Sequence, residues 1–282
     1  MPIQTVGVLG CGLMGSGIAQ VSAAAGCRTI VREIDQRRLD AGLARIRRFL
    51  DEGVARGKAT ADARDATLGR ITGTTGVDAF AACDLVIEAV SEDLATKAAV
   101  YQAVEPALTE RAILASNTSS IGITELAMRT RRPDRFGGLH FFNPVPLMKL
   151  VEITRGLTTS DATFGALVDF ARAVGKEPVI APDQPGFIVN RLLIPYLLNA
   201  VRCLEQGLAT REDIDKAMVL GCGHPMGPLA LVDFIGADTT YAIANIMFDE
   251  FRDPAFAAPP LLRRMVLAGK LGRKSGEGFY RY

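Results

Sequence analysis

The chain has 282 residues, of which 49% are hydrophobic and 22% are charged, and its formal net charge is +1. This length suits two domains, and the near-neutral charge argues against a nucleic-acid partner, which usually requires a marked basic excess. No apolar run reaches the ~20 residues that cross a bilayer, so we expect no membrane span.

The N-terminal part alternates short apolar segments with helical ones. The expected strands are Thr5–Leu9, Thr29–Glu33, Leu85–Ala89, Ile113–Ser116, Gly137–Phe141, Leu150–Ile153 and Pro178–Ala181. Leu13–Ala25 and Arg37–Gly53 are predicted helices, the first amphipathic along one face, and Gly26 stands where a glycine commonly ends a helix. Near-continuous apolar strands separated by helices are typical of a mostly parallel sheet covered on both faces, a doubly wound Rossmann-type α/β fold.

The pattern changes after the turn predicted at Asp183–Gly186. Strand-like runs stop, and helical patterns continue to about Leu271. The first long helical segment begins near Ile188 and contains Pro195, which predicts either a kink or a boundary. We therefore expect two domains, 1–184 and 185–282, the second one all-α.

A glycine-rich loop, Gly10-Cys11-Gly12-Leu13-Met14-Gly15, follows the first strand and opens the first helix. Gly10 permits a tight turn, Gly12 lets the backbone approach a pyrophosphate, and Gly15 lets the helix pack closely on the strand. The helix N-terminus would face the anionic phosphates. Glu33 closes the next strand, where a carboxylate accepts hydrogen bonds from a ribose. The pattern predicts a dinucleotide site.

Glu33 also bears on the type of dinucleotide. A carboxylate there repels a 2′-phosphate, which favours NAD over NADP. The nearby basic residues leave NADP open, since they would accommodate that phosphate unless they simply form a solvated face: Arg28, Arg32, Arg37 and Arg38.

His140 and His224 are the two histidines, and histidine is the usual general acid or base near neutral pH. His140 ends an expected strand, at the sheet edge where ligands bind in open parallel sheets. It is a catalytic candidate, although a lone histidine is also commonly structural. His224 lies in a glycine- and proline-rich turn and is interpreted as a loop residue.

Three further segments carry candidate polar residues. Glu152 stands in an apolar strand, where an unpaired carboxylate is costly. It either orients an imidazole or faces water from an edge strand. The run Ser116–Ser120 follows another strand and either binds a ligand or caps the helix predicted at Ile121–Met128. Asn190 stands early in the long helix, next to the domain junction, and clefts between domains are preferred ligand sites.

The five cysteines lie scattered without a C-x-x-C pair, as is typical of reduced thiols. The first strand begins close to Met1, so we expect no signal or transit peptide. Together these features indicate a cytoplasmic protein without a metal site.

Several blocks together resemble the 3-hydroxyacyl-CoA dehydrogenase family, in family order over essentially the whole chain. Besides the glycine loop they are 87–92, 116–120, 138–152, 185–191 and 272–280. The resemblance implies an oxidoreductase of fatty acid metabolism that interconverts (3S)-3-hydroxyacyl-CoA and 3-oxoacyl-CoA by hydride transfer with a nicotinamide cofactor. Short or medium chains such as 3-hydroxybutyryl-CoA are the implied substrates, with 3-hydroxyadipyl-CoA as the alternative.

The resemblance also implies residue roles. His140 would be the acid/base and Glu152 its charge partner, while Ser119 and Asn190 would hydrogen-bond the 3-oxygen of the substrate. The residues implied for the cofactor are Gly10, Gly12, Leu13, Met14, Gly15, Glu33, Ala89, Val90, Glu92, Lys97, Asn117, Ser119, Asn143 and Lys274.

Two partners follow from the same resemblance. The basic segment after the second strand would contact an anionic CoA, although a solvated helix surface explains its charges as well. Family members tend to pair their helical domains, so we expect a homodimer through 187–282. Two rivals stay open: a 6-phosphogluconate-type dehydrogenase, and a non-catalytic protein that binds NAD.

Overall fold

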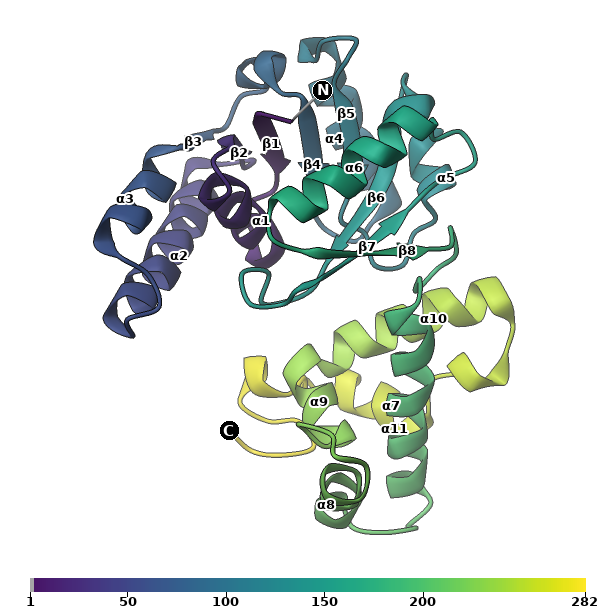
Figure 1. Ribbon diagram of the computed structural model, residues 1–282. Helices are drawn as coiled ribbons and strands as arrows, with labels where there is room; N and C mark the ends of the chain where they lie inside the picture. Colours follow the sequence, from purple (N-terminus) through teal and green to yellow (C-terminus); the bar gives the residue numbers. More distant parts are fainter. Residues whose placement is uncertain (1–2) are drawn as a thin grey trace. The chain divides into compact units, whose positions relative to one another are not determined.

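The computed structural model describes residues 3–282 and divides the chain into two compact units, Met1–Gln184 and Pro185–Tyr282 (Figure 1). The first unit is a sheet with helices, and the second is built from helices. The predicted fold class, a Rossmann-type domain followed by an all-α domain, is confirmed.

One eight-stranded sheet, in the order β3-β2-β1-β4-β5-β6-β7-β8, forms the centre of the first unit. All neighbouring strands run parallel except β6 and β7, which pair antiparallel. The strands are β1 Thr5–Leu9, β2 Arg28–Arg32, β3 Ile71–Thr74, β4 Leu85–Glu88, β5 Ile113–Ser116, β6 Phe136–Phe141, β7 Leu150–Thr154 and β8 Glu177–Ala181. Since β1, β4, β5 and β6 are parallel, their carboxyl ends lie at one edge of the sheet.

The seven strands expected from the sequence are present, with ends shifted by one residue at most. Strand β3, which lies at the sheet edge beside β2, was not predicted. This strand is short, contains Gly73 and has no fully buried residue. It therefore lacks the apolar run by which the central strands are recognised.

The helices of this unit are α1 Leu13–Ala24, α2 Gln36–Ala55, α3 Ala61–Gly69, α4 Leu94–Val104, α5 Ile123–Ala127 and α6 Asp161–Ala173. In Figure 1, α1 and α6 lie in front of the sheet and α4 lies behind it. The prediction of a one-faced amphipathic α1 is wrong, because every residue from Gly15 to Ala23 is buried. The strands cover one side of α1, and α2 and α3 cover the other.

The second unit contains α7 Val189–Glu205, α8 Arg211–Cys222, α9 Pro228–Ile235, α10 Ala237–Phe251 and α11 Pro260–Leu267. Helix α7 runs through Pro195, so a helix boundary at this proline is wrong. Its buried face, which includes Leu197 and Val201, packs in a core with residues of α9, α10 and α11. Within residues 3–282 no single helix is long and apolar enough to cross a membrane; α9 and α10 pass that test only as a pair bent by 95°.

Candidate active site

The glycine loop has the geometry that a pyrophosphate requires. Gly10 has a φ of +94°, and a side chain there would approach the carbonyl of Ala89. A Cβ on Gly15 would overlap the carbonyl of Gly10, so helix α1 can approach the strand only without one. At Gly12, which is exposed at the start of α1, an added Cβ would meet no atom within 4 Å. The open N-terminus of α1 therefore fits an anionic phosphate.

Glu33 is held against this loop. Its Oε1 accepts a hydrogen bond of 2.8 Å from the backbone N–H of Cys11, and its Oε2 accepts one of 3.0 Å from Ile34. Backbone thus fixes the carboxylate beside the loop, where it disfavours a 2′-phosphate. Two of the arginines that left NADP open have other partners: Arg32 donates to the carbonyl of Thr75, and Arg38 pairs with Asp35.

His140 and Glu152 face each other across the antiparallel pair β6–β7, at directly opposed positions. The Nδ1 of His140 lies 2.8 Å from Oε2 of Glu152. The histidine is 7% exposed and the glutamate is fully buried. A carboxylate on Nδ1 orients the imidazole and stabilises its protonated form, as a general base requires. The alternative of a water-facing Glu152 is wrong.

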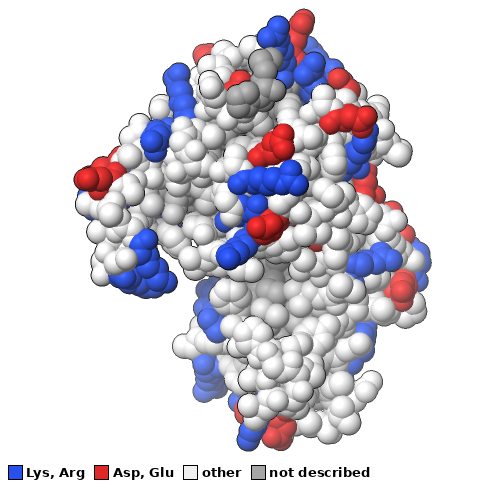
Figure 2. Space-filling model, viewed as in Figure 1, with Lys and Arg blue, Asp and Glu red and all other residues white. Residues whose placement is uncertain are grey.

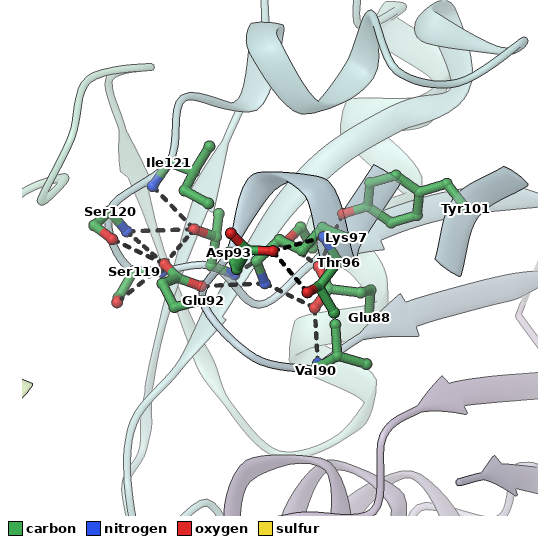
Figure 3. Close-up of polar contacts among 12 residues, drawn as sticks. Glu88, Val90, Glu92, Asp93, Thr96, Lys97, Tyr101, Ser119, Ser120 and Ile121 are labelled. Atoms are coloured by element: carbon green, nitrogen blue, oxygen red, sulfur yellow. Dashed lines mark hydrogen bonds and ion pairs between the residues drawn. The ribbon is translucent and has the colours of Figure 1, made fainter. Parts of the chain in front are cut away.

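A buried charged cluster lies where β4 ends (Figure 3). Oε1 of Glu88 accepts hydrogen bonds of 2.7 Å from Nζ of Lys97 and 2.8 Å from the N–H of Val90. Its Oε2 accepts from the hydroxyls of Tyr101, at 2.8 Å, and Ser116, at 2.7 Å. The second carboxylate on Lys97 is Glu92, whose Oε2 lies 3.1 Å from Nζ.

Lys97 remains charged although it is 1% exposed. Burial alone lowers the pKa of its ammonium, but the attraction of Glu88 and Glu92 outweighs burial and raises the pKa above its usual value. For Glu92 burial likewise opposes ionisation; the charge of Lys97 and the hydrogen bonds from Thr118 and Ser119 prevail, so the pKa of Glu92 is lowered. The cluster therefore contains a cation held by two acidic side chains.

Glu92 organises the turn 118–120 after β5 (Figure 3). Its Oε1 accepts from the Thr118 hydroxyl at 2.5 Å, from the Ser119 N–H at 2.8 Å and from the Ser120 N–H at 3.0 Å. The alternative that this run caps the following helix is wrong. The N-cap of α5 is Gly122, and the carboxylate of Asp183 accepts the first N–H groups of that helix.

Asn117 links two strand ends of the sheet. Its backbone N–H donates to the carbonyl of Glu88, and its side-chain Oδ1 accepts from the N–H of Phe141 at 2.9 Å. Phe141 follows His140 in β6, and Ser119 stands two residues after Asn117. The candidates Ala89, Val90, Glu92, Asn117, Ser119, His140 and Asn143 therefore all follow or end strands at the carboxyl edge of the sheet.

The other candidates belong to the helical unit. Asn190 is a half-buried residue in the first turn of α7. Lys274 lies in a short 3₁₀ segment, and its Nζ pairs with Asp238 at 2.5 Å. His224 lies in the loop before α9, where its Nδ1 is 3.0 Å from the hydroxyl of Tyr196. The interpretation of His224 as a loop residue is confirmed.

Two family models match the chain from end to end. Residues 5–184 match the NAD-binding domain of 3-hydroxyacyl-CoA dehydrogenase, and residues 186–282 match its C-terminal domain. The chain belongs to the 3-hydroxyacyl-CoA dehydrogenase family. It is therefore an NAD-dependent oxidoreductase of 3-hydroxyacyl-CoA substrates, and the rival 6-phosphogluconate-type assignment is wrong.

Named relatives are similar over the same length. A 3-hydroxybutyryl-CoA dehydrogenase of Mycobacterium tuberculosis is 51% identical over 99% of both chains. The crystal structure of M. tuberculosis FadB2 superposes with a TM-score of 0.98 at 50% identity, covering both chains completely. That of (S)-3-hydroxybutyryl-CoA dehydrogenase PaaH1 from Ralstonia eutropha gives a TM-score of 0.95 at 45% identity, covering 99% of each chain.

Glu88 is the residue of this site that the sequence analysis did not single out. It lies inside the block 87–92 that carried the family resemblance, and within the strand expected at Leu85–Ala89. Its position was the available signal: a carboxylate that follows Leu85, Val86 and Ile87 in an apolar strand needs charged or polar partners. Its partners come from α4, which carries Lys97 and Tyr101, and from β5, which carries Ser116, and only the packing of both elements on β4 brings them to Glu88.

Proposed function

We propose that this 3-hydroxyacyl-CoA dehydrogenase acts on short chains and interconverts (3S)-3-hydroxybutyryl-CoA and acetoacetyl-CoA. The observation that carries the chemistry is the buried contact between His140 and Glu152 at the carboxyl edge of the sheet. The relatives at 45–51% identity that are named 3-hydroxybutyryl-CoA dehydrogenases support the chain length. They favour it over 3-hydroxyadipyl-CoA and over a non-catalytic role.

In the proposed mechanism, NAD supplies the hydride acceptor in oxidation, and NADH the donor in reduction. Nε2 of His140 removes the proton of the substrate 3-hydroxyl, and Glu152 stabilises the imidazolium that forms. Ser119 and Asn190 donate hydrogen bonds to the 3-oxygen while its charge changes. The glycine loop and Glu33 bind the adenosine side of the dinucleotide. Ala89, Val90, Glu92, Lys97, Asn117, Asn143 and Lys274 are proposed for its nicotinamide half and the adjoining substrate.

Substitution of the histidine tests this mechanism. His140→Ala should lower kcat for reduction of acetoacetyl-CoA by about 10²–10⁴-fold, the usual contribution of a general acid or base. NADH binding, measured by fluorescence titration, should change little, because His140 does not belong to the glycine loop. Near-normal turnover in this variant would remove His140 from the mechanism.

For the CoA moiety we propose a groove of the first unit, of about 560 Å³, between α1, α2 and the segments 146–147 and 173–176. Its lining is mostly apolar, including Leu50 and Leu147, and Arg56 and Lys58 stand beside it. Figure 2 shows Lys and Arg side chains gathered at the tip of this unit near the end of α2, at the lower left of its surface. Apolar walls suit pantetheine, and the cations suit CoA phosphates.

The double variant Arg56→Ala/Lys58→Ala tests this groove. It should raise KM for acetoacetyl-CoA about tenfold, the effect of losing one or two phosphate contacts. The KM for NADH should not change. Arg48→Ala, which removes an exposed charge from α2 outside the groove, is the matched control. Equal KM values in the two variants would assign CoA to another surface.

We further propose a homodimer formed through the helical unit. This unit carries an apolar groove, lined by Ile188, Leu193, Met226, Leu231 and Phe234 among others. Leu192 and Phe234 on its rim are 72% and 43% exposed. Large apolar side chains gathered in this way mark interaction sites, and a second copy would bury them symmetrically.

A cytoplasmic location is the last part of the proposal. All five cysteines are free thiols, and Cys11, Cys27 and Cys83 are buried. Burial raises the pKa of Cys11 to about 11, so this thiol of the glycine loop stays protonated and unreactive. Free thiols of this kind suit a reducing compartment. Fractionation of cells of the source organism, followed by immunoblotting, tests the location.

A further inference from the structure

Glu88 stands behind the proposed site and touches none of the residues assigned to the acid/base pair. Four donors surround its fully buried carboxylate, two on each oxygen. A carboxylate has about four lone-pair positions, so these donors satisfy it completely in the ionised form. Because Ser116 Oγ already accepts from the N–H of Thr118 at 3.1 Å, its hydroxyl proton is free to point to Glu88.

Two routes lead from this carboxylate to the turn 118–120. In the first, Lys97 bridges Glu88 and Glu92, and Glu92 accepts the N–H groups of Ser119 and Ser120. In the second, Ser116 connects Glu88 to the N–H of Thr118. The first route is visible in Figure 3, where dashed contacts join Lys97 to the two glutamates and Glu92 to the turn. The turn that carries Ser119 is thus anchored on Glu88 from two sides.

We propose that Glu88 is a positioning residue, whose carboxylate holds Glu92 and the turn 118–120 through Lys97 and Ser116 and thereby sets the position of Ser119. The inference rests on the proposed function, in which Ser119 donates to the substrate oxygen. Its physical basis is that a hydrogen-bond donor acts fully only when its supporting residues fix it. Without the Glu88 carboxylate, Lys97 keeps its ion pair with the partly exposed Glu92 only, so the side chains of Lys97 and Glu92 can both shift.

The test compares Glu88→Gln with Glu105→Gln. Glu105 is a matched control, because it is also buried in this unit and bonded to the N–H of Arg131 and to Arg132, away from the site. Glu88→Gln should lower kcat for acetoacetyl-CoA about tenfold, the effect of one charge-assisted hydrogen bond. Glu105→Gln should leave kcat within about twofold while lowering the melting temperature comparably. Equal kcat values for the two variants would overturn the inference.

A double-mutant cycle separates positioning from general destabilisation. If Glu88 acts through Glu92, then Glu88→Gln adds little to the loss caused by Glu92→Gln. A combined loss equal to the product of the single losses would show that the two act independently and would refute the relay. If Glu88→Gln does not fold, Ser116→Ala decides: kcat should fall about threefold, as for one lost neutral hydrogen bond, and an unchanged kcat would refute the inference. A wild-type enzyme that does not oxidise NADH with acetoacetyl-CoA would refute the proposed function itself.

Discussion

The role of a polar side chain in this protein depends on its hydrogen-bond partner. The two histidines differ in this partner: Nδ1 of His140 contacts the carboxylate of Glu152, whereas Nδ1 of His224 contacts the hydroxyl of Tyr196. The carboxylate is buried completely, so its only way to remain compatible with the core is to hold a donor. At this scale, the chemistry of the site depends on pairs of residues whose members are far apart in the chain.

Glu152→Gln tests the pair directly. The amide cannot offset the charge of an imidazolium, and its NH₂ group can favour the wrong tautomer of His140. We expect kcat to fall about 10²-fold, a typical loss for a disturbed general base, with NADH affinity unchanged. Stopped-flow measurement of NADH oxidation checks this, with Glu105→Gln as the control. A variant that retains wild-type kcat would contradict a role for Glu152.

At the scale of secondary-structure elements, helix α2 supports the glycine loop, and its sequence does not reveal this role. Gly42 lies on α2 with Cys11 directly against it, and a Cβ at this position would overlap both the thiol and the carbonyl of Cys11. Nη1 of Arg45, one turn further along, donates to the same carbonyl at 3.2 Å. The helix therefore supports the glycine loop. It can come this close to the loop because Gly42 has no side chain.

Two glycines of the same helix provide a matched test. Gly42→Ala should push the loop away from α2, destabilise the protein by about 1–3 kcal/mol as overpacking does, and weaken NADH binding. Gly53→Ala meets no atom within 4 Å and should stabilise the protein by about 0.5–1 kcal/mol, the usual gain of alanine over glycine in a helix. Urea unfolding and NADH titration distinguish the two. Equal effects would contradict the contact with Cys11.

At the scale of the whole molecule, each unit has its own core. In the first unit the core joins residues of the sheet, such as Val6 and Ile87, to residues of the covering helices, such as Ile18 of α1 and Leu167 of α6. In the second it lies among the helices, around Leu197 and Val232. The helical unit carries the more exposed apolar groove, which is why we assign the dimer contact to it.

Sedimentation velocity tests the dimer. The wild-type protein should sediment at about twice the mass of one chain. Leu192→Glu places a charge on the rim of the groove and should produce monomers, because burying an unpaired carboxylate costs several kcal/mol. Leu208→Glu, at a leucine that is 74% exposed outside the groove, should remain dimeric. A wild-type monomer, or a dimeric Leu192→Glu variant, would refute this interface.

The amino-acid sequence alone was sufficient for the fold class, for the glycine loop with Glu33, and for the family. These depend on local patterns: apolar runs, a turn that needs glycine, and residues close together in the chain. The pairing of His140 with Glu152 was expected from the family resemblance, and the structure confirmed the contact. Only the tertiary structure showed that Glu88 holds Lys97 and that Glu92 binds the turn at Ser119. The pairing of β6 with β7 and of β4 with β5, and the packing of α4 after β4, decide these contacts. The short edge strand β3 and the support of the loop by Gly42 were decided in the same way, by packing between distant segments.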